Sequence, residues 1–386
     1  MTTVHAARSC EEVEALRPVW ESMEGGRLPS DIDLFLTFLE HSTRVLRPHV
    51  VLVEDGAAKA LVVARLEDFP LAAQLGYGIG YTPTVRALTV VYGGFLGDVE
   101  AVGTGAVLDA LAESLRGERL DLLRLRMLTV DSGLHSEASS RAPALRLRRF
   151  APKTTHWAAR IPGSMDEFLA ARSRERRKNV RRHARRLEES YGDGLKIRFF
   201  ASPADLDGLY EACVRVHRTS YQHALGVGFS SDERQRRLTE LSMRKGWYLA
   251  GVLFLCGEPV AFQLGTAYRG TYAASGTAFD PAHSEERPGT YLLMKMIERL
   301  CEDPAVNRLD FGFGDADYKR AFADESWTEQ DVEVFGRRPR PLGINLVQTS
   351  IRGASAAARS ALARTGHLGD VRRSWRSRLA AGDREG

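Results

Sequence analysis

A predicted strand near the carboxyl end of the chain is followed at once by side chains suited to acid–base chemistry. The segment, residues 309–322, reads LDFGFGDADYKRAF. Ligands of α/β proteins bind at the carboxyl ends of strands. A lysine or tyrosine there could hold a developing oxyanion or protonate a leaving group, whereas the simpler interpretation is a solvated turn with an ordinary surface lysine. The residues concerned are Gly312, Gly314, Asp315, Tyr318 and Lys319.

A second candidate site lies where another predicted strand turns into a helix. The segment GTAFDPAHSEERPGTYLLM places Arg287, Gly289 and Thr290 just before the helix. A helix start offers unpaired N–H groups and partial positive charge, and glycine lets a phosphate come close. The simpler interpretation is a loop glycine before a pre-ordered helix start. An earlier turn, VEAVGTGAVL, has Glu100 and no basic residue, so the later turn is the better candidate.

Motifs of several other enzyme classes are missing. The sequence has no G-x-x-x-x-G-K-[ST] phosphate loop, no H-E-x-x-H, no G-x-S-x-G and no EF-hand loop. Its 10 histidines are scattered, and its 4 cysteines lie far apart without a C-x-x-C pair. We therefore expect neither a metal site nor a disulfide scaffold, and the usual support for NTPase or hydrolase chemistry is lacking.

The charge is unevenly distributed over the 386 residues. The net charge is only +4, but residues 172–186, from Arg172 to Arg186, hold nine Lys or Arg and one Glu. Residues 351–386 hold eight Arg and three acids, so the remaining chain is mildly acidic. An anionic partner would dock on these two basic segments.

The elements that must position these residues occur twice in the same order: hairpin, strand, helix, strand. The first set covers residues 49–128, with a turn at Asp55 and Gly56, and the second covers residues 247–313. Gly103–Thr104 corresponds to Gly289–Thr290, and residues 119–122 correspond to residues 308–311. We predict an α/β protein of two tandem modules with mixed, mostly antiparallel sheets flanked by helices.

We divide the chain into three parts. Residues 1–160 form the first module and residues 161–345 the second, which begins with a basic helix at about 164–191, capped by Ser164. Residues 346–386 form a basic Ala/Arg-rich tail, either helical or disordered. The first thirty residues lack a signal-peptide core, and the longest apolar stretch, residues 247–256, is half a membrane span. We expect a cytoplasmic protein without a transmembrane segment.

The second half, roughly residues 162–334, resembles the GNAT-type acyltransferases of the Fem-like, double-domain kind, including those of the cellulose-biosynthesis type. Four segments carry the resemblance, and they occur in this order: SRERRKNVRRHARRLEE, YEACVRVHRTSY, the GEPVAF hairpin with DPAHSEERPGTYLL, and DFGFGDADYKRAF. The first half of the chain resembles the degenerate N-terminal module of these proteins.

The resemblance implies two GNAT folds and transfer of an acyl group from a carrier to an amine. It assigns Lys319, with Tyr318 beside it, to the acyl-transfer site and Gly289 to the CoA pyrophosphate. The family histidine corresponds to His217, our candidate base, although a core or surface histidine is an equal alternative. Common GNAT proteins have R/Q-x-x-G-x-G/A before the central helix, whereas this chain has R-P-G-T.

We therefore expect an N-acyltransferase that moves an acyl group, in the simplest case acetyl, from acyl-CoA to an amine of a sugar, glycan precursor or small metabolite. The alternatives are a Fem-like aminoacyl transferase that uses charged tRNA, bound at residues 172–186, and a non-catalytic scaffold. If residues 172–186 do not bind tRNA, they form either a solvated face or a site for an acidic substrate or polymer. Leu368, Val371, Trp375 and Leu379 suggest a membrane-surface or partner helix in the tail.

Overall fold

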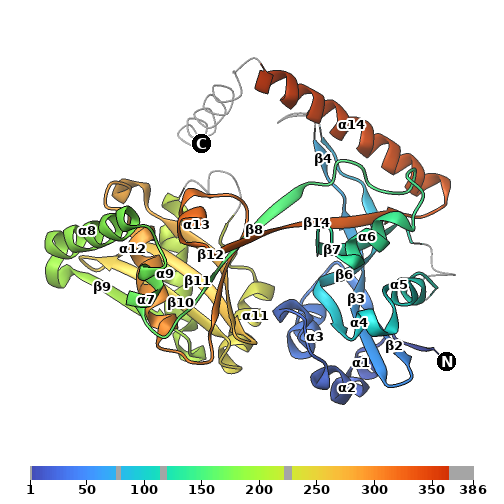
Figure 1. Ribbon diagram of the computed structural model, residues 1–386, viewed down its shortest axis with the longest axis horizontal. Coiled ribbons are helices and arrows are strands. Elements are labelled where there is room, and N and C mark those ends of the chain that lie inside the picture. Colours follow the sequence, from blue (N-terminus) through green and yellow to red (C-terminus); the bar gives the residue numbers. More distant parts are fainter. Residues whose placement is uncertain (1, 75–79, 114–119, 221–227, 365–386) are drawn as a thin grey trace. The chain divides into compact units, whose positions relative to one another are not determined.

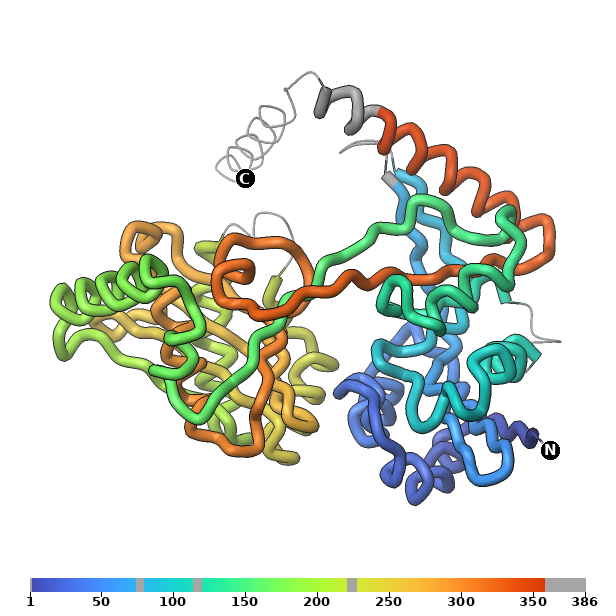
Figure 2. The backbone as a smooth tube through the Cα atoms, viewed as in Figure 1, coloured from blue at the N-terminus to red at the C-terminus, as the bar shows by residue number. Residues whose placement is uncertain are grey.

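The computed structural model describes residues 2–74, 80–113, 120–220 and 228–364, without the side chains of residue 74 and of residues 358–364. Among these, residues 2–154 and 328–364 form unit 1, and residues 155–327 form unit 2 (Figure 1). The chain therefore leaves unit 1 once and later returns to it, as the path in Figure 2 shows.

The second boundary differs from our division of the chain. We assigned residues 328–345 to the second module, but strand β14 (Glu325–Phe335) pairs antiparallel with β7 (Leu122–Thr129) from Glu329 to Phe335. These residues complete the sheet of unit 1. Pairing between strands some two hundred residues apart leaves no trace in local periodicity, which explains the error.

The sheet of unit 1 has the strand order β1-β2-β3-β6-β7-β14. Neighbours are antiparallel except β6 and β7, which are parallel over Ala87–Val90 and Leu122–Leu125. The predicted hairpin is confirmed, with Gly56 at φ +61° in the turn between β2 and β3. The other strands are β1 (Thr3–Ala7), β2 (Val45–Asp55), β3 (Ala58–Pro70), β6 (Thr84–Gly97) and the short pair β4 (Ala73–Gln74) and β5 (Gly80–Tyr81).

Helices cover both faces of this sheet (Figure 1). One apolar cluster lies under α4 to α6, a second under α1 to α3, and a third, around Phe335 and Ile344, under α14. The helices are α1 (Cys10–Ala15), α2 (Arg17–Ser22), α3 (Ile32–Glu40), α4 (Val99–Val102), α5 (Thr104–Glu113), α6 (Gly133–Ser140) and α14 (Pro339–Arg364).

Helix α14 also corrects the start of the predicted tail. It begins at Pro339 rather than after residue 345, and Ile344, only 6% exposed, packs into the core of unit 1. The region up to residue 364 is therefore a helix of unit 1. The stripe from Leu368 to Leu379 lies outside the described residues. No helix in the described ranges is long and apolar enough to span a membrane.

The sheet of unit 2 has the order β8-β13-β12-β11-β10-β9. It repeats the plan of unit 1, since β12 and β13 are its parallel neighbours and the helix between them, α12, crosses one face. The duplicated order of elements is therefore confirmed. The strands are β8 (Lys153–Arg160), β9 (Leu195–Phe200), β10 (Tyr248–Leu255), β11 (Glu258–Tyr268), β12 (Thr271–Phe279) and β13 (Arg308–Phe313).

Two apolar clusters hold the helices of unit 2 against opposite faces of its sheet. The first involves α7, α8, α12 and α13, and the second involves α9 and α11. The basic segment forms two helices, not one, because Ser173 caps a new helix by accepting a bond from the Arg176 N–H (3.2 Å). The helices are α7 (Met165–Ala170), α8 (Arg174–Tyr191), α9 (Leu206–Thr219), α11 (Glu233–Arg244), α12 (Pro288–Cys301) and α13 (Asp317–Phe322).

The parallel pairing of β12 with β13 depends on close packing around Tyr272. This residue pairs with Leu309, is fully buried, and donates a hydrogen bond from its hydroxyl to the Leu249 carbonyl (2.9 Å). A Cβ atom at Gly265 would overlap the Tyr272 ring.

Gly265→Ala should therefore lower the free energy of unfolding by about 1–3 kcal/mol, because the ring must move within a filled core. Urea unfolding of the full chain measures the loss. Gly276→Ala is the matched control, since its nearest neighbour would be Leu264 Cδ1 at an ordinary 3.6 Å. Equal losses in both variants would contradict the packing argument.

Candidate active site

The sheet of unit 2 splits at the carboxyl ends of its two parallel strands. The pairing between β12 and β13 covers only Thr271–Ala273 and Arg308–Asp310. Strand β12 continues beyond this point along β11, with an extra residue near Ser275, whereas the end of β13 pairs with β8 at Phe313. Backbone and side chains at such a split are accessible to a ligand.

Lys319 lies at the end of β13 and is not an ordinary surface lysine. It is 7% exposed, and its Nζ donates hydrogen bonds to the carbonyl oxygens of Gly312 (3.1 Å) and Phe313 (2.7 Å). Gly312 makes this possible by adopting φ +71°, which turns the strand end toward the lysine. Burial lowers the pKa of Lys319, while the charges of Asp310 and Asp315 oppose that shift.

The buried carboxylate of Asp310 holds the end of β13 in place. Asp310 is 3% exposed, and its Oδ1 accepts the N–H of Gly312 (2.8 Å) and lies 3.2 Å from Nδ1 of His156 on β8. The His156 ring stacks on Trp327 and meets the edge of Phe313, each at 5.0 Å between centroids. Asp310 and His156 thus fix the loop that holds Lys319.

Sequence reasoning missed this pair. Asp310 could have been found from the sequence, because a carboxylate inside a predicted buried strand needs a partner. His156 could not, since it lies on a separate strand 154 positions earlier.

Two other predicted residues lie beside Lys319 with different surroundings. Asp315 is exposed and forms an ion pair with Arg320. Tyr318 is half-buried and packs edge-on against Phe311, with 6.4 Å between ring centroids. The structure therefore gathers Gly312, Gly314, Asp315, Tyr318 and Lys319 around one strand end.

The second predicted cluster lies at the start of α12. Arg287 is exposed, has φ +54°, and its carbonyl accepts the N–H groups of Thr290 and Tyr291. Gly289 follows Pro288 in the first turn, and a Cβ there would only touch Phe279 at 3.6 Å. The packing therefore does not demand glycine at this position.

The basic helix α8 lies beside this helix start. Tyr291 Oη donates to Glu188 (2.9 Å), and Tyr191 Oη donates to Glu286 (3.3 Å). Burial and the nearby charges of Arg287, Arg182 and Arg186 lower the pKa of His183 on α8. Helix α8 therefore brings both basic and acidic side chains close to the start of α12.

His217 is placed apart from these groups. It lies in the last turn of α9, which packs on the opposite face of the sheet from α12 and α13. Its Nδ1 is 3.5 Å from Ser220 Oγ, and residues 221–227 that follow lie outside the described chain. The described contacts do not bring His217 to Lys319. No three His, Cys, Asp or Glu side chains of the described residues group as metal ligands.

Asp310→Asn should lower the free energy of unfolding by about 1–3 kcal/mol, because the change weakens charge-assisted hydrogen bonds made by a buried group. Asp315→Asn, at an exposed ion pair, should change it by at most about 1 kcal/mol. Urea unfolding followed by tryptophan fluorescence compares the two variants. An equal effect of the two changes would refute the supporting role of Asp310.

Part of the second unit matches a known protein family. Residues 174–320, from the first residue of α8 into α13, match the family model described as "Acetyltransferase (GNAT) domain". No curated protein matches the chain significantly.

Solved structures match over nearly the whole chain. FemX is 11% identical with a TM-score of 0.57, and the match covers 88% of this chain and 100% of FemX. The C-terminal domain (DUF2156) of an Agrobacterium fabrum protein described as a lysylphosphatidylglycerol synthetase is 13% identical with a TM-score of 0.51, covering 88% and 96% of the respective chains. The protein therefore has a Fem-like tandem fold and carries a GNAT-type acyltransferase domain.

Proposed function

We propose that unit 2 transfers an acyl group, in the simplest case acetyl, from acyl-CoA to an amino group. The observation that supports this most directly is the split after Asp310, which has the open start of α12 on one side and the anchored Lys319 on the other. Both lie within residues 174–320, the part of the chain that matches the GNAT family. Unit 1, in this proposal, is a degenerate copy without transfer chemistry.

The residues at the α12 start would hold the phosphates of the donor. The N–H of Gly289 and the partial charge of the helix attract an anion, and Arg287 adds a full positive charge. The R-P-G-T sequence supplies fewer loop amides than the common GNAT pattern. In our proposal Arg182 and Arg186 of α8, whose charges act on His183 together with that of Arg287, add positive charge for the donor phosphates.

The transfer step forms a C–N bond and breaks the C–S bond of the thioester. The amine attacks the carbonyl carbon, an oxyanion develops, the amine loses a proton, and the leaving thiolate gains one. Lys319 has three N–H donors, and its two carbonyl contacts hold it in a fixed position at the strand end. We assign it to the oxyanion or to the donor charge, with Tyr318 beside it. His217 is kept as the candidate base on the resemblance alone, because α9 packs on the other face of the sheet from α13.

The acceptor is an amine of a sugar, glycan precursor or small metabolite in this proposal. The resemblance to the cellulose-biosynthesis type favours a glycan precursor.

Charged tRNA is the second candidate donor, and one observation favours it. Arg174, Lys178, Arg182 and Arg186 lie four residues apart along α8, are exposed, and have no carboxylate of the described chain within ion-pair distance. Such a stripe can follow a phosphate backbone. Binding of tRNA that falls steeply between about 50 and 200 mM salt would support this donor.

Acetyl-CoA at about 100 times its Kd should stabilise the full chain by roughly 2.7 kcal/mol, because it binds only the folded state. A thermal-shift titration with CoA, acetyl-CoA and longer acyl-CoAs measures this. Gly289→Glu should abolish the shift, since its carboxylate repels phosphate although it suits a helix start. Gly289→Ala is the folding control. No shift with any CoA ester would exclude this donor, and absence of tRNA binding as well would leave the scaffold hypothesis.

Lys319→Met should lower turnover by about 10²–10³, the usual loss when one oxyanion donor is removed. Acetyl-CoA consumption with an amine acceptor measures it. Lys295→Met is the matched control, because this lysine of α12 pairs with Glu298 on the same helix, and it should stay near the wild-type rate.

An undiminished rate in folded Lys319→Met would remove this residue from the mechanism. In the same assay, His217→Gln should abolish the pH dependence of turnover near neutrality if His217 is the base.

A further inference from the structure

One face of the sheet of unit 1 carries a row of polar side chains where sheet interiors are usually apolar. Arg65 on β3 is opposite Thr89 on β6, Thr89 is beside Arg124 on β7, and Arg124 is opposite Glu333 on β14. Thr89 and Glu333 are 0% and 2% exposed. Apolar clusters lie two residues away along the strands on both sides, under α1–α3 and under α14.

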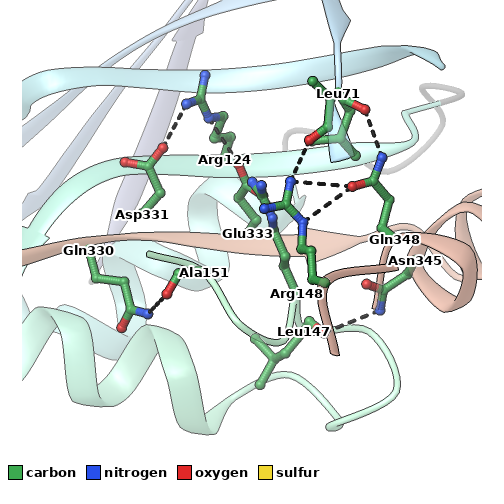
Figure 3. Close-up of polar contacts among 12 residues, drawn as sticks. Leu71, Arg124, Leu147, Arg148, Ala151, Gln330, Asp331, Glu333, Asn345 and Gln348 are labelled. Carbon is green, nitrogen blue, oxygen red and sulfur yellow. Dashed lines mark hydrogen bonds and ion pairs between the residues drawn. The ribbon is translucent and has the colours of Figure 1, made fainter. Parts of the chain in front are cut away.

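Most charges in this row are compensated (Figure 3). The Arg124 guanidinium donates to Asp331 (2.7 Å) and Glu333 (3.1 Å), and Arg148 forms an ion pair with Glu333. Arg65 donates to Glu67 at 2.8 Å. These contacts have the geometry of a structural network.

Arg126, two residues after Arg124, is not compensated in the same way. Its nearest carboxylate is Asp331, 3.7 Å from Nε, which already accepts from Arg124 and from the Met127 N–H (2.9 Å). The Arg126 Nε is buried and has no hydrogen-bond partner among the described residues. Burial and the charge of Arg124 lower the pKa of Arg126.

The groups around Arg126 carry more positive than negative charge. The four guanidinium groups of Arg65, Arg124, Arg126 and Arg148 lie among three carboxylates, those of Glu67, Asp331 and Glu333. Arg352 approaches the same region and is bonded to Gln348 and the Ala72 carbonyl, which bring no negative charge. A second buried donor on the row, Thr89 Oγ1, also has no partner in the described chain.

The backbone is distorted at the same place. Residues 126 and 127 lie opposite the single residue Asp331, and Met127 has φ +49°, which is unfavourable for a side chain other than glycine. Bulges and positive φ values are typical of positions where a strand presents a side chain to a ligand.

We propose that Arg126, together with Thr89 and Arg65, forms a binding site in unit 1 for an anionic group, a carboxylate or a phosphate, that supplies the missing negative charge. The planar guanidinium matches the paired oxygens of such a group, and the Thr89 hydroxyl adds a neutral donor. The proposed anion site lies in unit 1, whereas the residues assigned to acyl transfer all belong to unit 2. Either proposal can therefore be wrong without affecting the other.

The test compares the full chain with Arg126→Met and, as matched control on the same strand, Arg124→Met. Thermal shifts are recorded with inorganic phosphate and with succinate against chloride at equal ionic strength. Wild type should show a saturable shift with at least one of these anions, and Arg126→Met should weaken the apparent affinity at least tenfold. Phosphate or succinate acting alone identifies the preferred group.

Stability without added anion gives an independent readout. Arg126→Met should leave the Tm nearly unchanged or raise it, because it removes a guanidinium whose buried Nε has no hydrogen-bond partner in the described chain. Arg124→Met should lower the Tm, because the buried Glu333 and the half-buried Asp331 each lose a charged hydrogen-bond donor. Thr89→Val should weaken anion binding several-fold at unchanged Tm. Absence of saturable binding of both anions, or equal binding by wild type and Arg126→Met, would overturn the proposal and leave a structural ion network.

Discussion

The parallel contact between β12 and β13 lasts only three residue pairs, and the candidate active site depends on where it stops. Tyr272 holds the paired part together from within the core, and Asp310 is the last residue of β13 that pairs with β12. From there Gly312 turns the chain, its N–H bonds back to Asp310, and the two carbonyls that follow hold Lys319. A sheet that continued to pair would bury all of these groups against a neighbouring strand.

Both units hold positive charge that local structure does not neutralise. In α8, basic residues four apart repel one another by a few tenths of a kcal/mol a pair, so the helix must be stabilised elsewhere. The Ser173 cap, the buried Val180 and Leu187, and the Tyr291–Glu188 bond supply that stabilisation. In unit 1, the packing of the sheet supplies the stabilisation that offsets the charge of Arg126. Such charge opposes folding unless a ligand uses it.

The two units share a plan and differ in chemistry at the corresponding place. In sequence, Asp121 and Asp310 occupy equivalent positions of the repeated motif, but Asp121 precedes the parallel pairing of unit 1 and forms ion pairs with Arg338 and Arg340. Asp310 ends the pairing of unit 2 and supports the lysine loop. The residue correspondence that we predicted from the repeat is therefore not a correspondence of roles.

The sequence by itself determined what depends on near neighbours. Alternation of apolar residues and glycine turns predicted the hairpins, a strand-to-helix glycine predicted the start of α12, and the repeated order predicted two modules of one fold. Only the tertiary structure decided the return of β14 to unit 1, the contact of His156 with Asp310, the burial of Lys319 and the weak pairing of Arg126 with Asp331. Strand register and burial arise from contacts between residues up to two hundred positions apart, and no local pattern specifies which distant group will neutralise a charge.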